Sequence, residues 1–354
     1  MKFFYTLFFL FVLVSSSVAQ TEIPNQPLSV QNLNLMLRRS VGRDMTEADV
    51  IARIQRFGID FEPTPEIMGR FRFNGAHPSL LNAIRRAGAK NLGDTDGKVT
   101  TIVKVKDPII EEVRQKVKDY VDELPDFICS QEVERFVDTD GTGTWQRGDN
   151  LVYELTYNRK NESYKMVRVN GMPADKLQKI VGGASSAGEF ASTLDNLFDP
   201  ATQTEFIPAG KEKLGTHQTW IYDYHIKQQN SALSVSLGGG PAFIAAHSGS
   251  IWIDADSKYV LRIEQAVEDP PAQYRTFSGD KIIDYELVKI KGLENEVLLP
   301  IKAEVSMLNR AQKGYSRNVI RFKFYRKFES DVKVILDGEK PEKDVKPEEK
   351  PPPK

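Results

Sequence analysis

From residue 126 to residue 336, hydrophobic and polar residues alternate, with every second position apolar. A period of two indicates strands with one buried face and one wet face, as in an antiparallel sheet. The clearest runs are 151–157, 220–226, 259–264, 301–307 and 320–324. Turn sequences of the Asp-Gly and Asn-Gly kind separate them. The spacing predicts about nine to eleven strands, enough for a strongly curled or barrel-like sheet.

Residues 29–88 follow a helical period instead and contain signals for four short helices. The clearest of these signals are Thr64-Pro65, which begins one helix, and Gly58 and Gly88, which end two others. Residues 89–108 are polar and predict a linker, and a fifth helix is expected over 109–124. The tail 337–354 is rich in Lys, Glu, Asp and Pro, which predicts disorder.

The predicted class is therefore α+β. A small N-terminal helical module (29–88) precedes a curled antiparallel β-sheet or open β-barrel domain (109–336) with a helical lid or plug. The lid or plug interrupts the alternation within 176–198, where a Gly-rich stretch leads to a short amphipathic helix. Its apolar residues are Phe190, Leu194, Leu197 and Phe198. They either form a mobile lid over the open face of the sheet or simply complete its core.

Residues 1–19 have the pattern of a secretory signal peptide, with Lys2 before a short apolar run and a Ser-Val-Ala cleavage site. The apolar run is shorter than the ~20 residues of a membrane-spanning helix, and no later apolar segment approaches that length. We therefore expect an exported, soluble protein that is periplasmic or secreted and does not span the membrane.

The 354 residues carry 48 basic and 49 acidic side chains, a net charge of −1. A balance so close to zero gives no reason to expect steering towards nucleic acid. Arginines are nevertheless frequent in the helical module. Those that could form a docking face for an envelope protein or an anionic polymer are Arg53, Arg56, Arg85 and Arg86. The alternative is an ordinary solvated helical surface.

Catalytic signals are sparse. Cys129 is the single cysteine, so an intramolecular disulfide is excluded, and its place beside Phe127 favours a buried hydrophobe over a reactive thiol. The chain has no nucleophile elbow, zinc-protease motif or dinucleotide fingerprint. His217, His225 and His247 are scattered, which does not favour a metal site. We expect no catalytic residues, no metal and no cofactor.

Aromatic residues are common at positions predicted to face inward. They are Tyr153, Tyr157, Tyr164, Trp220, Tyr222, Tyr224, Phe322 and Phe324. An incompletely filled curled sheet lined by such residues would bind an apolar or lipid-like ligand. A plain filled core is the alternative.

Several short motifs resemble those of uncharacterised exported bacterial proteins. They include Gly188-Glu189-Phe190, 249–254 running into 260–264, and Leu299-Pro300. The strand ending in Trp252-Ile253-Asp254 and the following Leu261-Arg262 are more remotely similar to the lipoprotein-carrier (Lol-type) superfamily. That resemblance covers about 126–330 and implies an open antiparallel barrel with a helical lid that holds acyl chains. It implies no catalytic residues. The sequence thus favours an exported binding protein for an apolar ligand over a structural or interaction protein that docks through its arginines.

Overall fold

A computed structural model of the chain describes residues 26–42, 47–74, 76–93, 107–139, 145–176, 188–236, 242–268, 270–271, 277–309 and 314–328. The predicted signal peptide, most of the predicted linker (94–106), residues 177–187 of the predicted lid segment and the tail 337–354 lie outside these ranges.

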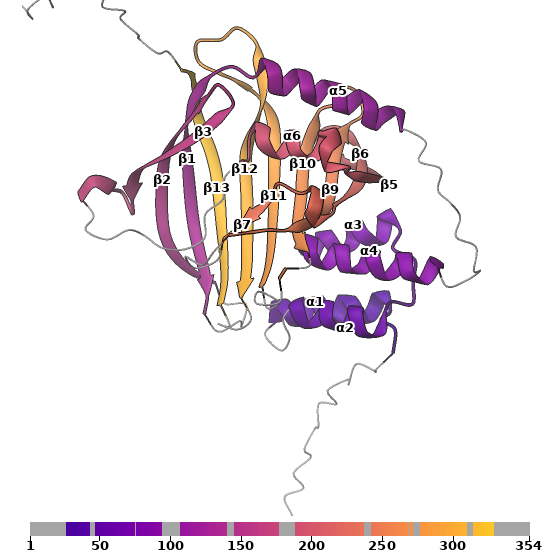
Figure 1. The fold of residues 1–354 in the computed structure, drawn as a ribbon. Coiled ribbons are helices and arrows are strands. Elements are labelled where there is room, and N and C mark those ends of the chain that lie inside the picture. Colours follow the sequence, from indigo (N-terminus) through magenta and orange to yellow (C-terminus); the bar gives the residue numbers. More distant parts are fainter. Residues whose placement is uncertain are drawn as a thin grey trace, which may run out of the picture.

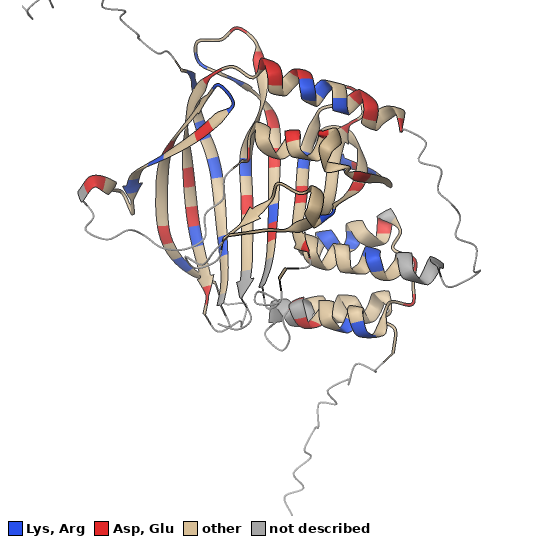
Figure 2. Cartoon of the chain, in the orientation of Figure 1, with Lys and Arg blue, Asp and Glu red and all other residues tan. Residues whose placement is uncertain are grey.

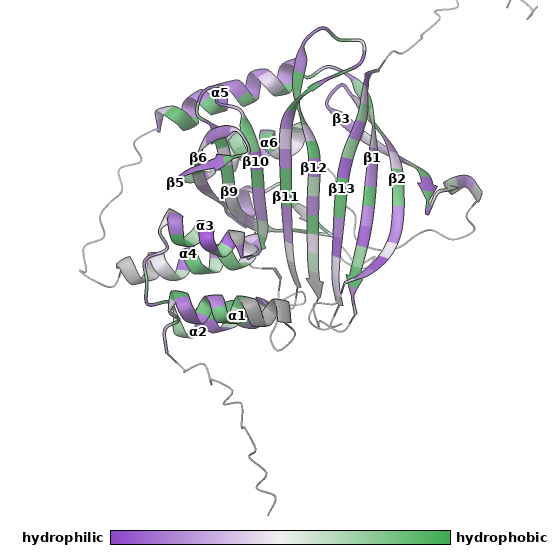
Figure 3. Cartoon of the chain, turned by 180° about the vertical axis from the view of Figure 1, so that it is seen from behind, coloured by the Kyte–Doolittle hydropathy of each residue, from purple (hydrophilic) through white to green (hydrophobic). Residues whose placement is uncertain are grey.

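The described residues form one open antiparallel sheet of 11 strands in the order β4-β3-β2-β1-β13-β12-β11-β10-β9-β6-β5 (Figure 1). A small second sheet pairs β7 with β8. The strands are β1 (Phe127–Asp138), β2 (Gln146–Asn158), β3 (Asn161–Val169), β4 (Met172–Pro173), β5 (Glu205–Leu214), β6 (His217–Ile226), β7 (Ser234–Val235), β8 (Phe243–Ile244), β9 (Ala246–Asp254), β10 (Val260–Glu268), β11 (Phe277–Lys289), β12 (Glu296–Asn309) and β13 (Gly314–Lys327). The alternation of apolar and polar residues that predicts them is visible along β11, β12 and β13 (Figure 3).

Helices flank this sheet. They are α1 (Val30–Gly42), α2 (Glu47–Phe57), α3 (Pro65–Phe73), α4 (Pro78–Gly93), α5 (Pro108–Glu123) and α6 (Ala191–Phe198), with short 3-10 turns η1 (Ala174–Lys176), η2 (Pro200–Thr202) and η3 (Gln228–Asn230). Two helices begin as their sequences predict, since Thr64 and Asp107 cap backbone N–H groups of α3 and α5 ahead of a first-turn proline. The α+β class with an open, curled antiparallel sheet is confirmed.

The alternating side chains of β9 show that the helices pack on opposite faces of the sheet. On β9, Ile251 and Ile253 belong to the core that includes α5 and α6. Ser250 and Trp252 point the other way, where the side chains of Arg85 and Arg72 meet them. Strand β9 is consequently buried along its whole length. The inner face of the sheet carries α5 and α6, and the outer face of β9, β10 and β11 carries the helical module.

The buried apolar residues form two large clusters. One joins the inner face of the sheet to α5 and α6, and the other lies within the helical module around Leu33, Phe71 and Leu81. The two clusters share no residue. Ion pairs and hydrogen bonds connect the helical module to the sheet. The domain boundary at 89–108 stays a prediction, because most of that stretch is outside the described residues.

One predicted inward position is wrong. Phe324 is 76% exposed, whereas Phe322 and Tyr325 are buried. The register between β1 and β13 shifts between Ile128 and Ser130, and Phe324 has a φ of +58°. This is a β-bulge, in which one extra residue reverses the alternation. Tyr325 therefore occupies the inward place that a strict period of two gives to Phe324.

Replacing Phe324 with glycine should stabilise the protein by about 0.5–1 kcal/mol, because a positive φ costs a non-glycine residue energy that glycine does not pay. Urea unfolding would measure the change. The control is Ser316→Gly on the same strand, which has no positive φ and should lose stability. A loss of stability in Phe324→Gly as large as that in Ser316→Gly would contradict the expectation.

Candidate functional site

The inner face of the sheet is the candidate site, and seven of the eight predicted aromatic residues contribute to its core. Four of them are buried: Tyr157, Tyr222, Tyr224 and Phe322. Three others are partly buried and pack against the same cluster: Tyr153, Tyr164 and Trp220. The sequence pattern therefore places these side chains correctly, while the eighth, Phe324, is exposed by its bulge.

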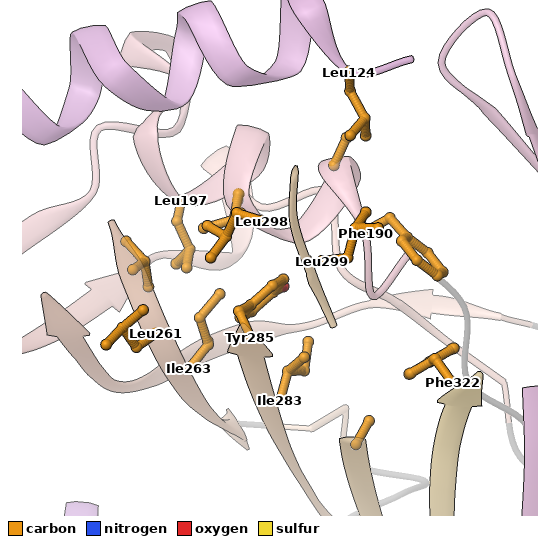
Figure 4. Close-up of a cluster of buried hydrophobic side chains, with 14 of the residues drawn as sticks. Leu124, Phe190, Leu197, Leu261, Ile263, Ile283, Tyr285, Leu298, Leu299 and Phe322 are labelled. Atoms are coloured by element: carbon orange, nitrogen blue, oxygen red, sulfur yellow. The ribbon is translucent and has the colours of Figure 1, made fainter. Parts of the chain in front are cut away.

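Helix α6, which belongs to the segment predicted as lid or plug, packs on this face, with Phe190 and Leu197 among the side chains of the strands (Figure 4). Phe190, Leu194, Leu197 and Phe198 are all at most 2% exposed. The Phe190 ring lies 5.2 Å from that of Phe127 and 5.1 Å from that of Phe322, measured between centroids. In this structure α6 is thus a plug, and its apolar side chains occupy the space over the strands.

Polar contacts attach the plug at its two ends. At the N-terminal end, the backbone N–H of Gly188 donates to Glu162 Oε2 at 3.0 Å, and Tyr285 Oη donates to the carbonyl of Glu189 at 2.7 Å. At the C-terminal end, Arg114 of α5 donates to the carbonyl of Phe198. Gly188 has a φ of +82°, a backbone conformation that suits glycine. The apolar middle of α6 is therefore held by packing and its ends by hydrogen bonds.

The N-terminal attachment includes ionisable groups away from water. Burial raises the pKa of the Glu162 carboxyl, and the nearby charge of Glu189 raises it further. Burial likewise raises the pKa of Tyr164, whose hydroxyl donates to Glu162. Lys281 Nζ lies 4.0 Å from Glu189 Oε1, and Glu189 is fully buried. The inner face thus combines an oily centre with a polar cluster where α6 begins.

The outer face carries a different, charged arrangement against the helical module (Figure 2). Arg85 Nε lies 2.6 Å from Asp223 Oδ2, and Arg72 Nε lies 3.3 Å from Glu264 Oε1. Arg86 pairs with Glu268. Ser79 and Asn82 add hydrogen bonds to the sheet. Burial raises the pKa values of Asp223 and Glu264. The module therefore contacts the sheet through ion pairs and hydrogen bonds.

These pairs change the interpretation of the predicted docking face. Arg85 and Arg86 form ion pairs with Asp223 and Glu268 of the same chain, so their charge is partly balanced within the protein. The other two residues, Arg53 and Arg56, lie on α2 with their guanidinium groups over the Phe57 ring. The sequence could not distinguish an arginine that pairs within the chain from one that faces water, because its acidic partners are more than 100 positions away.

Two groups near this contact should make stability depend on pH. Asp280 accepts hydrogen bonds from the backbone and hydroxyl of Ser79, and burial raises its pKa from 3.8 to about 7. The charge of Glu47 raises the pKa of His77 from 6.5 to about 9. Both groups hold a proton more tightly in the folded state. Their contribution to the free energy of unfolding is greatest at low pH, and it falls between pH 3.8 and about 7 for Asp280 and between pH 6.5 and about 9 for His77.

Replacing Asp280 with asparagine should remove the first part of this pH dependence, because the amide cannot ionise in its buried position. Urea unfolding at about pH 5, 7 and 9 would show a smaller loss of stability between the first two values than in the wild type. The control is Glu294→Gln, an exposed residue in the turn between β11 and β12, which should follow the wild type. Parallel curves for wild type and Asp280→Asn would contradict the expectation.

Neither a metal site nor a reactive thiol is found among the described residues. Among the described residues, no group of three or more His, Cys, Asp and Glu side chains could hold a metal ion. Burial raises the pKa of the Cys129 thiol, which disfavours a reactive thiolate. His217, His225 and His247 contact different partners, namely Asp254, Glu268 and Ser231. No helix in the described part of the chain is long and apolar enough to cross a bilayer.

A cleft that sequence reasoning missed lies between α3, α4 and strands β5, β6 and β9. Its lining combines Arg72, Arg85, Asp223 and His225 with apolar residues of β5. A signal was present in the sequence, since arginines on the module and acidic residues at outward positions of the strands have complementary charge. Only the fold, however, brings them together.

Comparison with known proteins finds similar solved structures of low sequence identity. No family model matches the chain, and no curated protein matches it. A DUF1329 family protein from Desulfovibrio piger is 15% identical, with a TM-score of 0.31, over 64% of this chain and 95% of that one. A LolA superfamily protein from Nitrosomonas europaea is 9% identical, with a TM-score of 0.31, over 64% of this chain and 97% of that one.

Proposed function

We propose that this protein binds an apolar or lipid-like ligand on the inner face of its sheet, in the space that α6 fills in the present structure. The observation that carries the proposal is the attachment of α6. Its buried side chains make apolar contacts, and an acyl chain could replace such contacts at little cost. Its hydrogen bonds lie at the two ends.

The length of α6 supports a reversible displacement. It has 8 residues and no side-chain hydrogen bond at its N-cap, Phe190, and helices this short are not stable in isolation. The segment therefore keeps its helical form through packing on the sheet. A ligand that competes for the inner face would release it, and the segment would return when the ligand leaves.

Location outside the cytoplasm is part of the same proposal. The signal-peptide pattern of residues 1–19 supports export to the periplasm or beyond. An aqueous compartment between membranes is one where an apolar molecule needs a carrier protein, because its free solubility is low. Docking of a protein or polymer through all four predicted arginines has less support, since Arg85 and Arg86 form ion pairs with the sheet and not a continuous face with Arg53 and Arg56 on α2.

A neutral fluorescent lipid tests the proposal. A pyrene-labelled acylglycerol added to the purified chain should give saturable fluorescence with about one probe per protein, and native mass spectrometry should show the same adduct. Hydrogen exchange of the α6 amides should accelerate in the loaded protein, because the helix loses its packing. Amides of α4 serve as the internal control and should not change. Absence of saturable uptake, or uptake with unchanged exchange in α6, would refute the proposal.

A further inference from the structure

The cleft between the helical module and the outer face of the sheet has the size of a ligand site. Its volume is about 830 Å³, within the range of small-molecule pockets. Its lining on β6 consists mainly of Ile221, Asp223 and His225, which alternate with Tyr222 and Ile226 of the inner core and so face the opposite side of the sheet from α6. Tyr224 belongs to both the inner core and the cleft lining. A molecule bound there would not compete with one bound under α6.

Two guanidinium groups in the cleft are held in fixed positions. Arg85 contacts Asn82 Oδ1 at 2.8 Å, Ser250 Oγ at 2.9 Å and Asp223 Oδ2 at 2.6 Å. These contacts use three of the five N–H bonds of a guanidinium. Arg72 donates to Glu212 and lies over the Trp252 ring, 4.6 Å from its centroid. Their remaining N–H bonds are available to a ligand at little entropic cost, since the side chains are already ordered.

The acidic partners of these arginines are mostly hidden from the cleft. The side chains of Glu264 and Glu268 are 4% and 6% exposed, and neither lines the cleft. Asp223 does line it, but one of its oxygens accepts from Arg85 and the other from Ser250. Carboxylates thus hold both arginines in place. Glu264 is 4% exposed, and Glu212, to which Arg72 donates, is 38% exposed. Arg72 and Arg85 both line the cleft.

The rest of the lining is largely apolar, although it also includes the acidic residue Glu62. It comes from the start of α3 and from strand β5, the last strand of the sheet, and includes Pro63, Met68, Ile207 and Pro208. Ile207 is 63% exposed, so a ligand that covered it would remove apolar surface from water. A guanidinium pair beside an apolar wall matches a molecule with an anionic head and an aliphatic body.

We propose that this cleft binds a small amphiphilic anion. Its carboxylate or phosphate head contacts Arg72 and Arg85, with Arg86 nearby, and its aliphatic body lies against Ile207 and Pro208. Guanidinium groups bind both kinds of head through paired hydrogen bonds. Free fatty acids and alkyl phosphates both have this chemistry. Comparing the affinities of a carboxylate and a phosphate head group shows which of the two classes the cleft prefers.

Calorimetric titration of the full chain with octanoate, octyl phosphate and octyltrimethylammonium, each below its micellar concentration, tests the charge preference. At least one of the two anions should bind and the cation should not, because the cleft presents guanidinium groups. Equal binding of cation and anions would overturn the proposal. So would binding of neither anion.

A pair of matched variants tests the location. Ile207→Asp places a carboxylate on the cleft wall at an exposed position and should weaken anion binding at least about tenfold through repulsion. Leu287→Asp is the control, since Leu287 is 50% exposed on β11 and does not line the cleft. Unchanged anion affinity in Ile207→Asp would overturn the proposal.

The same variants separate this inference from the proposed function. Uptake of the neutral pyrene-labelled acylglycerol should be equal in wild type and in Ile207→Asp, because the inner face is unaltered. If that neutral lipid displaces octanoate, the anion occupies the inner face, and the cleft proposal fails while the proposed function stands. If octanoate binding depends on Ile207 and the neutral lipid does not bind, the cleft proposal stands and the proposed function fails.

Discussion

Replacing Gly249 with alanine is expected to destabilise the protein by about 3 kcal/mol or more, since a clash with backbone leaves little room for relaxation. A Cβ at this position would lie 1.8 Å from the carbonyl oxygen of Glu264 and 3.0 Å from Cε1 of Tyr224. Strands β9 and β10 would have to separate there. The hydrogen bond from Tyr224 Oη to the Glu264 carbonyl, 3.0 Å long, would be strained as well.

Urea unfolding measures this loss, and Gly148→Ala provides the matched control. Gly148 lies on β2, and a Cβ there would come no closer than 3.5 Å to another residue. Alanine should be neutral or slightly stabilising at that site, because glycine weakens a strand. A Gly249→Ala variant as stable as Gly148→Ala would show that the two strands tolerate the extra methyl group, against expectation.

Replacing Phe190 with alanine should cost about 3–5 kcal/mol of stability, the usual loss for a wholly buried phenylalanine. Phe190 is 0% exposed and contacts the rings of Phe127, Phe322 and Tyr325. Removal of the ring leaves a cavity where α6 begins. Because it also removes apolar contacts that hold the helix on the sheet, the variant should take up more of the neutral pyrene-labelled acylglycerol than the wild type.

Phe206→Ala is the comparison for this variant. Phe206 stacks on Phe198 at 5.1 Å between centroids but is only partly buried, so its removal should cost less and leave the N-terminal attachment of α6 intact. Denaturation midpoints give the stability, and pyrene fluorescence gives the uptake. Lower uptake in Phe190→Ala than in the wild type would mean that the ring belongs to the binding surface itself and is not part of a removable plug.

The sequence predicts the class of fold and most of its elements, because their signals are local. A period of two defines the strands, and capping residues such as Thr64 define helix starts. The misplacement of Phe324 has a non-local cause. Its bulge arises from a register shift against Ile128 and Ser130 of β1, nearly 200 positions earlier, and no residue type near Phe324 marks it.

The candidate sites were predictable to different degrees. The apolar face of α6 is a local pattern, and the structure places Phe190, Leu194, Leu197 and Phe198 in the core as one group. The partners of Arg85, by contrast, are Asp223 and Ser250. Those pairings depend on how the helical module is positioned on the outer face of the sheet, which no periodicity encodes. The cleft is formed by the same contact between module and sheet, so the sequence alone does not predict it.

An open sheet leaves two rims of unpaired backbone groups, which in principle invite one copy of a chain to add to another. Both rims are interrupted here. At one, β4 has only two residues and ends in Pro173. At the other, β5 contains Pro208, and its register on β6 shifts between Pro208 and Gly210. The rim at β5 therefore offers no long straight row of donors and acceptors onto which a second copy of the chain could add.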